Sequence, residues 1–209
     1  MHTVHVDFAE LSKVSWRGSK TRAFVVAVDR NTRFAAARSG RQDAQAVIAL
    51  LSQRVFDDTR VIVSDHAKVF ESRALRTWAA ERGKELQIGS PYHFQSNGLA
   101  ERLIRDLKTF ISMYPDMQGG WRAALDAAVR HHNRSRYSTI GCSPWFALNR
   151  EVPYLPADEK FDVPRRVRLR EERFSAEREL RNRKEQKKNY DGRHITKVPS
   201  FTVGDSIRK

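Results

Sequence analysis

The sequence predicts an α/β fold: a mixed five-stranded sheet flanked by helices, followed by a charged helical extension and the beginning of a small β-barrel. Short apolar runs of strand length come first and then alternate with segments of helical periodicity. The 209 residues, 40% of them hydrophobic, suffice for one main core and an appendage. We therefore divide the chain into a core at 1–150, a basic helical linker at 151–198 and an incomplete barrel segment at 199–209.

The first half of the core contains the predicted sheet. The segment 22–29 is almost continuously apolar, which is typical of a strand covered on both faces. A hairpin-length turn at 29–31 connects it to the next strand, and Gly83 ends the second helix. In chain order we expect strands at 3–9, 22–29 and 32–38, a helix at 42–57, a strand at 60–64, a helix at 70–82 and a strand at 85–88.

Helices dominate the second half. A polar loop at 89–98 precedes a helix at 98–114 with a leucine-rich stripe, and further helices are expected at 121–134 and 145–148. The segment 164–190 consists mostly of Arg, Lys and Glu, which predicts a solvated helix or linker. The tail 201–209 resembles the first strand and turn of a small barrel.

Charge and cysteine content restrict the function classes. A formal charge of +14 favours a polyanionic partner such as nucleic acid, and the alternative is an ordinary charged surface. The single cysteine, Cys142, excludes an intramolecular disulfide framework and a cysteine-rich zinc module. The chain has neither a leader-like start nor an apolar stretch of about 20 residues, so we expect an intracellular protein without membrane insertion.

Three carboxylates are the candidate reactive groups. Asp7 lies inside an apolar strand, where a carboxylate is costly to bury unless it is paired or binds a metal. Asp65 ends the strand at 60–64, although Asp is also common in ordinary strand-to-helix turns. Glu101 lies in the first turns of a helix, where the macrodipole alone favours an acid. Together they predict a site for hard divalent cations.

Two cations continue the helix face of Glu101. Arg105 and Lys108 follow it at i+4 and i+7, away from the leucine stripe. This arrangement suits a phosphate backbone that enters a metal site, whereas a solvated Glu–Arg pair is the simpler alternative.

Several segments of the sequence resemble motifs of a known protein family. His5-Val6-Asp7-Phe8-Ala9, Val63-Ser64-Asp65 and the segment 91–102, PYHFQSNGLAER, resemble the core of retroviral and long-terminal-repeat retrotransposon integrases, most closely those of gypsy-type elements. The resemblance continues through Asn133-Arg134-Ser135, Gly141-Cys142-Ser143-Pro144, Lys187-Lys188-Asn189-Tyr190-Asp191 and Val203-Gly204-Asp205, and so covers nearly the whole chain.

The resemblance implies an RNase H-like fold and a DDE-type enzyme that trims retrotransposon DNA ends and joins them to target DNA. It implies that Asp7, Asp65 and Glu101 are catalytic and hold two Mg²⁺ or Mn²⁺ ions, as phosphoryl transfer by in-line displacement requires. It also implies a homo-oligomer that acts on double-stranded DNA in the nucleus. The positions that match contacts to the element end are Tyr92, Asn97, Arg105 and Lys108.

The chain departs from this family at several points. His66-Ala67 replaces the usual Asn-Gly after the second aspartate, and Phe94 replaces a proline in the loop, which puts the rate in doubt more than the fold. The expected zinc-binding segment before the core is missing and the barrel stops early, so we expect a core-centred fragment. The alternative is an inactive, domesticated DNA-binding or assembly protein. Ribonuclease H itself is a weaker alternative, because its fourth acid could only be Asp29 or Asp106.

Overall fold

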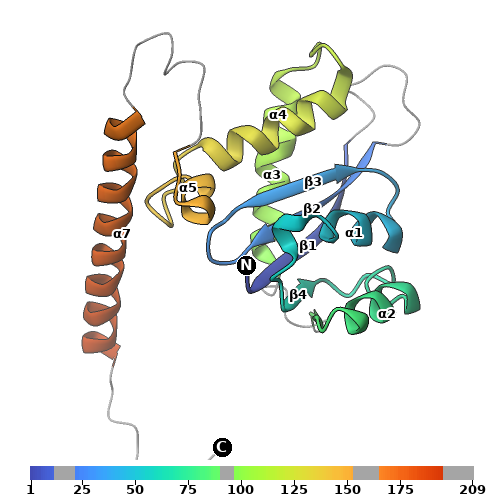
Figure 1. Cartoon of the computed structure of the whole chain (residues 1–209), viewed down its shortest axis with the longest axis horizontal. Coiled ribbons are helices and arrows are strands. Elements are labelled where there is room, and N and C mark those ends of the chain that lie inside the picture. The colour runs from blue at the N-terminus through green and yellow to red at the C-terminus, as the bar shows by residue number, and fades with distance from the viewer. Residues whose placement is uncertain (12–21, 90–96, 153–164, 195–209) are drawn as a thin grey trace, which may run out of the picture.

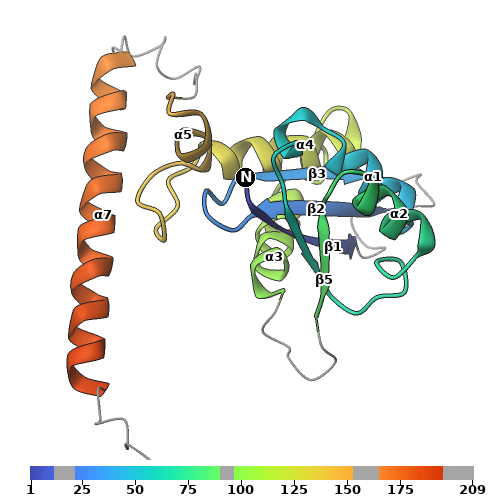
Figure 2. The ribbon, with the colours of Figure 1, turned by 60° about the horizontal axis from the view of Figure 1, so that its bottom comes forward.

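The computed structural model describes residues 1–11, 22–89, 97–152 and 165–194. One five-stranded sheet lies at its centre, with helices on both faces (Figures 1 and 2). The strands are β1 (Thr3–Glu10), β2 (Ala23–Asp29), β3 (Ala35–Ser39), β4 (Val61–Ser64) and β5 (Glu85–Ile88). The helices are α1 (Ala44–Leu51), the 3₁₀ turn η1 (Arg54–Phe56), α2 (Arg73–Glu81), α3 (Gly98–Met113), α4 (Gly120–Arg134), α5 (Pro144–Asn149) and α7 (Arg165–His194).

The sheet order is β3-β2-β1-β4-β5, so β1 is the central strand. The strands β1, β2 and β3 pair antiparallel as consecutive neighbours, and β4 and β5 then add in parallel on the other side of β1. This is the mixed sheet that the sequence predicts. The predicted fold class, a mixed five-stranded sheet flanked by helices, is confirmed.

Side chains alternate between two cores, as the period of a strand requires. Val4 and Val6 of β1 pack with α1 and α2 on one face, where the rings of Phe8 and Phe70 lie 5.4 Å apart. Ala9 of β1 packs with α3 and α4 on the other face. Because residues two apart in a strand share a face, Asp7 lies on the α3 side of the sheet.

Capping side chains define where several helices begin. Asp43 accepts a hydrogen bond from the backbone N–H of Ala46 at the start of α1. Ser72 does the same at α2, and Ser143, followed by Pro144, does it at α5. These ends follow directly from the sequence because Ser and Asp accept from the free N–H groups of a first helical turn.

Several predicted boundaries are wrong, and the second helix, for example, begins at Arg73 rather than at 70. The third strand begins at Ala35 rather than at 32, because the Asp29 carboxylate accepts from the N–H groups of Asn31 and Thr32 and holds them in a turn. The first helix ends at Leu51 rather than at 57. The buried ammonium group of Lys84 donates to three backbone carbonyls at 56, 57 and 59, which holds that segment in turns.

The basic extension is a helix, α7, and it contacts the core. Leu169 and Ala176 pack against a small cluster around Cys142 and Phe146. The Glu172 carboxylate accepts a 3.0 Å hydrogen bond from the backbone N–H of Ser143. The segment was predicted to be solvated, and most of its described side chains are exposed. The barrel prediction at 199–209 lies outside the described residues. Among the described helices, none is both long and apolar enough to cross a membrane.

Candidate active site

Two of the predicted carboxylates, those of Asp65 and Glu101, lie close enough to Asp7 for their charges to act on it. Asp7 lies on β1 and Asp65 directly follows β4, which is the parallel neighbour of β1. Glu101 lies in the first turn of α3, which packs on the Asp7 face of the sheet. The charges of Asp65 and Glu101 both act on Asp7 and raise its pKa.

Burial and neighbouring charges change the pKa of Asp7. Loss of solvent, together with the charges of Asp65 and Glu101, raises the pKa of its carboxyl from 3.8 to about 6. A 2.7 Å hydrogen bond from the backbone N–H of Phe8 to Oδ1 opposes this rise, as does the charge of Lys108. The half-buried carboxylate therefore lacks a full counter-charge, and a bound cation would stabilise its ionised form.

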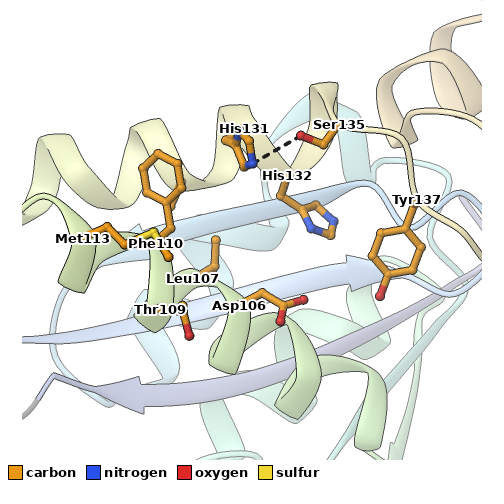
Figure 3. Close-up of a pocket in the computed structure, with 10 residues that line it drawn as sticks. Asp106, Leu107, Thr109, Phe110, Met113, His131, His132, Ser135 and Tyr137 are labelled. Carbon is orange, nitrogen blue, oxygen red and sulfur yellow. Dashed lines mark hydrogen bonds between the residues drawn. The ribbon is translucent and has the colours of Figure 1, made fainter.

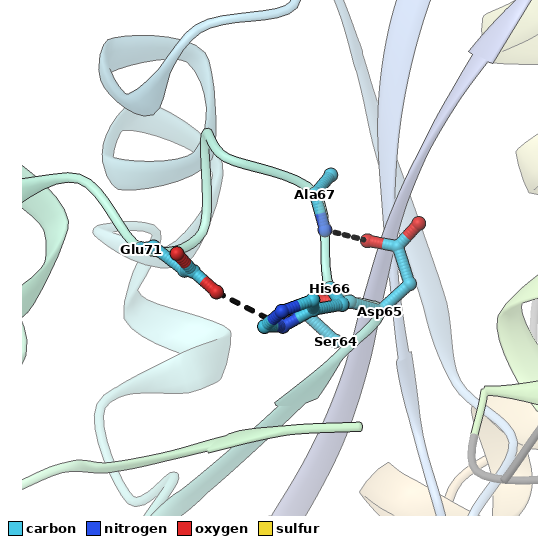
Figure 4. A network of polar contacts seen from close by, with 5 residues as sticks. All are labelled: Ser64, Asp65, His66, Ala67 and Glu71. Atoms are coloured by element: carbon cyan, nitrogen blue, oxygen red, sulfur yellow. Dashed lines mark hydrogen bonds and ion pairs between the residues drawn. The ribbon is translucent and has the colours of Figure 1, made fainter. Parts of the chain in front are cut away.

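Asp65 is exposed and is held by its own turn (Figure 4). Its Oδ1 accepts a 3.2 Å hydrogen bond from the backbone N–H of Ala67. The next residue, His66, forms a 2.9 Å contact through Nδ1 with the Glu71 carboxylate and points away from Asp65 (Figure 4). His66 therefore does not enter the carboxylate group.

Asn97 ties the start of α3 to β1. The pairing of β1 with β4 ends at His5 and Val63, so the Val6 carbonyl has no partner from β4. The Asn97 side-chain amide takes this place and donates to the Val6 carbonyl at 3.1 Å. The bond joins the residue before Asp7 to the residue four before Glu101.

His5 completes this connection and was not singled out from the sequence. Its pKa is lowered by burial, and an interaction with the Asn97 side chain partly offsets the change. Within the described residues, His5 Nδ1 and Asn97 Oδ1 are both buried and form no hydrogen bond, so two unsatisfied polar atoms lie beside the Asn97–Val6 bond. The position of His5 two residues before Asp7, on the same strand face, was the signal that could have identified it.

The predicted DNA contacts have different surroundings. Arg105 is exposed, and Lys108 is half-buried and close enough for its charge to lower the pKa of Asp7. Asn97 is only 3% exposed and bonds to β1, so here it positions the backbone and offers no surface for DNA. Tyr92 lies outside the described residues.

The carboxylates provide the right donors for a hard divalent cation but are not closed around a metal position. Oxygen ligands of this type suit Mg²⁺ and Mn²⁺, and the raised pKa of Asp7 reflects first its burial and then the nearby charges of Asp65 and Glu101. Even so, within the described ranges no group of three His, Cys, Asp or Glu side chains is arranged to hold a metal ion. Asp7, Asp65 and Glu101 are therefore residues that could hold a cation after their side chains adjust.

The two candidate fourth acids have other positions. Asp29 is fully buried at the end of β2, where it stabilises the turn described above. Asp106 follows Glu101 by five residues, about 140° round the helix, and lines a cavity between α3 and α4. Neither acid therefore joins Asp7, Asp65 and Glu101 as a fourth carboxylate.

Comparisons with known proteins agree with this fold. No family model matches the chain. The chain is homologous to part of foamy-virus Pro-Pol polyproteins: it is 28% identical over 127 residues to that of Simian foamy virus type 3 (strain LK3), across 59% of this chain. It is 38% identical over 53 residues to that of Simian foamy virus type 1, across 25% of this chain. The matches span 11% and 5% of those polyproteins.

Solved structures give the fold over a larger part of the chain. The catalytic core domain of BIV integrase superposes with a TM-score of 0.56 and 26% identity, covering 70% of this chain and 93% of that one. A chain of a simian T-cell lymphotropic virus intasome, solved in complex with PP2A regulatory subunit B56 gamma, gives a TM-score of 0.62 at 20% identity. That match covers 74% of this chain and 56% of the other, and it supports the fold alone. The fold is that of a retroviral integrase catalytic core.

Proposed function

We propose that this chain contains the catalytic core of a metal-dependent polynucleotidyl transferase that processes retrotransposon DNA ends and joins them to target DNA. The observation that carries the proposal is the environment of Asp7. It is a half-buried acid on the central strand whose pKa is raised to about 6 by lost solvent and by the charges of Asp65 and Glu101. A structural acid in an apolar strand would be paired with a cation, whereas a metal ligand is left with this excess of negative charge.

Asp7, Asp65 and Glu101 would hold Mg²⁺ or Mn²⁺. Two such ions, when bound, supply charge stabilisation to the attacking and leaving oxygens of an in-line displacement. The chain itself contributes fixed geometry. The Phe8 N–H orients the Asp7 carboxylate, the turn at Ala67 orients that of Asp65, and Asn97 fixes the start of the helix that carries Glu101.

Arg105 and Lys108 would guide the DNA backbone. They lie on the same face of α3 as Glu101, and the charge of Lys108 reaches Asp7. A phosphate bound by these cations is therefore led towards the carboxylates. Such contacts position DNA without reading its sequence. The role of Tyr92 at the same DNA end remains part of this proposal, and Asn97 is reassigned from a DNA contact to a positioning residue.

The finer assignment follows the motif resemblance. The segment PYHFQSNGLAER at 91–102 supports a gypsy-type element as the source. On the same basis we propose that the protein is a homo-oligomer that acts on double-stranded DNA in the nucleus. We also propose that its core spans 1–150 and that a basic extension follows the core. The net charge of +14 and the exposed cations of α7 support a polyanionic partner.

A strand-transfer assay with a duplex oligonucleotide and Mn²⁺ tests the proposal. A second assay should measure the reverse reaction, disintegration, on a preformed branched substrate. Disintegration depends less on a complete protein assembly than strand joining does. We expect cation-dependent activity from the parent chain and none from Asp65→Asn, with equal DNA affinity for both. A parent chain that binds DNA but has no activity on either substrate would support the inactive DNA-binding alternative.

A further inference from the structure

A cavity of about 370 Å³ lies between α3 and α4, outside the carboxylate group (Figure 3). Its volume falls in the range of small-molecule sites. Leu107 and Ala128 line it and are buried, and Phe110 and Met113 form one end. Asp106, His132 and Tyr137 lie towards the other end (Figure 3). The cavity thus has an apolar end and a polar end.

Aromatic rings are concentrated at this cavity. The Phe110 ring lies 5.1 Å from that of His131 and 4.9 Å from that of Tyr114. The rings of His132 and Tyr137 meet edge to face at 5.6 Å. Met113, which also lines the cavity, is 65% exposed and so leaves apolar surface open to a ligand. Ring faces carry negative electrostatic potential, so they attract cations and stack on planar groups.

Some polar groups of the cavity are hydrogen-bond acceptors without a partner among the described residues. The Thr109 hydroxyl already donates to the Arg105 carbonyl, and the Ser135 hydroxyl pairs with His131. By contrast, no described residue forms a hydrogen bond or ion pair with the Asp106 carboxylate, or a hydrogen bond with the Tyr137 hydroxyl. His132 uses Nε2 for the Arg33 carbonyl at 2.9 Å. Burial lowers the pKa of His132, which favours the neutral ring with Nδ1 as an acceptor.

Charge selects the ligand class. Among the described residues that line the cavity, Asp106 is the only acid and none is Lys or Arg, although the chain contains 39 Lys and Arg residues. A free carboxylate, an imidazole acceptor and a phenol face a ligand that donates several hydrogen bonds and carries positive charge. Planar guanidinium and amidinium groups meet both conditions and stack on aromatic rings.

We propose that this cavity binds a small organic cation in which a guanidinium or amidinium group is attached to an apolar or aromatic body. The charged group contacts Asp106 beside His132 and Tyr137, and the body lies against Phe110 and Met113. The site is independent of the carboxylates on β1 and β4, and the inference does not depend on the proposed function.

Binding of three probes to the 209-residue chain, measured by NMR titration, tests the inference. Phenylguanidinium is the charged probe, phenylurea is its neutral analogue of the same shape, and benzoate reverses the charge. We expect saturable shifts at α3 and α4, with phenylguanidinium binding at least threefold more tightly than phenylurea and benzoate binding most weakly. This order runs against the positive net charge of the protein, so it reports the cavity and not the overall field.

Two variants make the test specific. Asp106→Asn keeps the shape of an exposed side chain and should weaken phenylguanidinium about three- to tenfold, while phenylurea changes less than twofold. Asp126→Asn makes the same charge change on an exposed position of α4 that does not line the cavity, and should change nothing. Equal affinities for the charged and neutral probes, an unaffected Asp106→Asn variant, or shifts located away from α3 and α4 would each overturn the inference.

Discussion

The side-chain amide of Asn97 donates a 3.1 Å hydrogen bond to the backbone carbonyl of Val6 at the point where β1 and β4 separate. The same separation exposes the ends of the strands that carry Asp7 and Asp65. Asn97 therefore satisfies a buried carbonyl and also fixes the distance between β1 and the helix of Glu101. The Asn97 side chain therefore connects the point where β1 and β4 separate with the carboxylates that are proposed to bind the metal.

Asn97→Ala should lower the turnover rate in the branched-substrate assay by about tenfold or more, because small displacements of reacting groups are costly. DNA affinity should change by less than about twofold, and the unpaired Val6 carbonyl should reduce the free energy of unfolding by about 1–3 kcal/mol. Asn149→Ala is the matched control, since its amide also bonds a carbonyl but is exposed. An equal loss of turnover in both variants would contradict the positioning role.

Asp7→Asn should stabilise the protein at neutral pH in the presence of EDTA. Because the folded-state pKa of Asp7 is raised to about 6, its contribution to stability is fully present below pH 3.8 and is lost as pH rises through 6. The free energy of unfolding of the variant should therefore exceed that of the parent by about 1–2 kcal/mol at pH 7.5, after allowance for solvent screening. The difference should be small at pH 4.5. Urea denaturation at both pH values measures it, and a difference independent of pH would refute the assignment.

Divalent cations should raise the melting temperature of the parent chain. A Mn²⁺ concentration ten times the dissociation constant stabilises a one-site protein by about 1.4 kcal/mol, or roughly 3–5 °C for a chain of this size. Asp65→Asn should lose most of this shift because it removes a charged ligand. Asp126→Asn, at an exposed position of α4, should keep it. A full shift in Asp65→Asn would exclude that carboxylate as a ligand.

Lys108→Ala and Arg105→Ala should each weaken DNA binding across all sequences. Each should also reduce the slope of log affinity against log salt by about one unit, as expected for a lost phosphate contact. Arg76→Ala is the control, because Arg76 is exposed on α2, which packs on the opposite face of the sheet. Fluorescence anisotropy at several salt concentrations gives the slopes. Equal slopes for all three variants would show that the cations of α3 are ordinary solvated surface.

Gly141→Ala should displace α7 from the core. Gly141 has a positive φ of 71°, and a Cβ there would lie 2.5 Å from Glu179 Cβ and 2.6 Å from the Ser175 carbonyl. Gly120→Ala introduces similar backbone strain at φ 72° with no neighbour within 4 Å. Limited trypsin digestion should therefore cut α7 faster in Gly141→Ala than in Gly120→Ala. Identical digestion would indicate that the contact between α7 and the core is too weak to protect the helix.

The order of the strands and helices could be predicted from the sequence alone. Apolar runs, helical stripes and capping residues such as Ser72 and Ser143 act over a few residues, so local spacing is sufficient to locate them. The special status of Asp7 was also visible, because a carboxylate in an apolar strand requires compensation wherever that strand lies.

Only the tertiary structure decided which groups meet. The placement of β4 beside β1, the burial of Asn97 against Val6 and the interaction of His5 with Asn97 join segments about 60 to 90 residues apart in the chain. Local periodicity carries no information about such contacts. The early end of α1 and the docking of α7 through Glu172 have the same origin, since a distant side chain satisfies backbone groups that the local sequence leaves open.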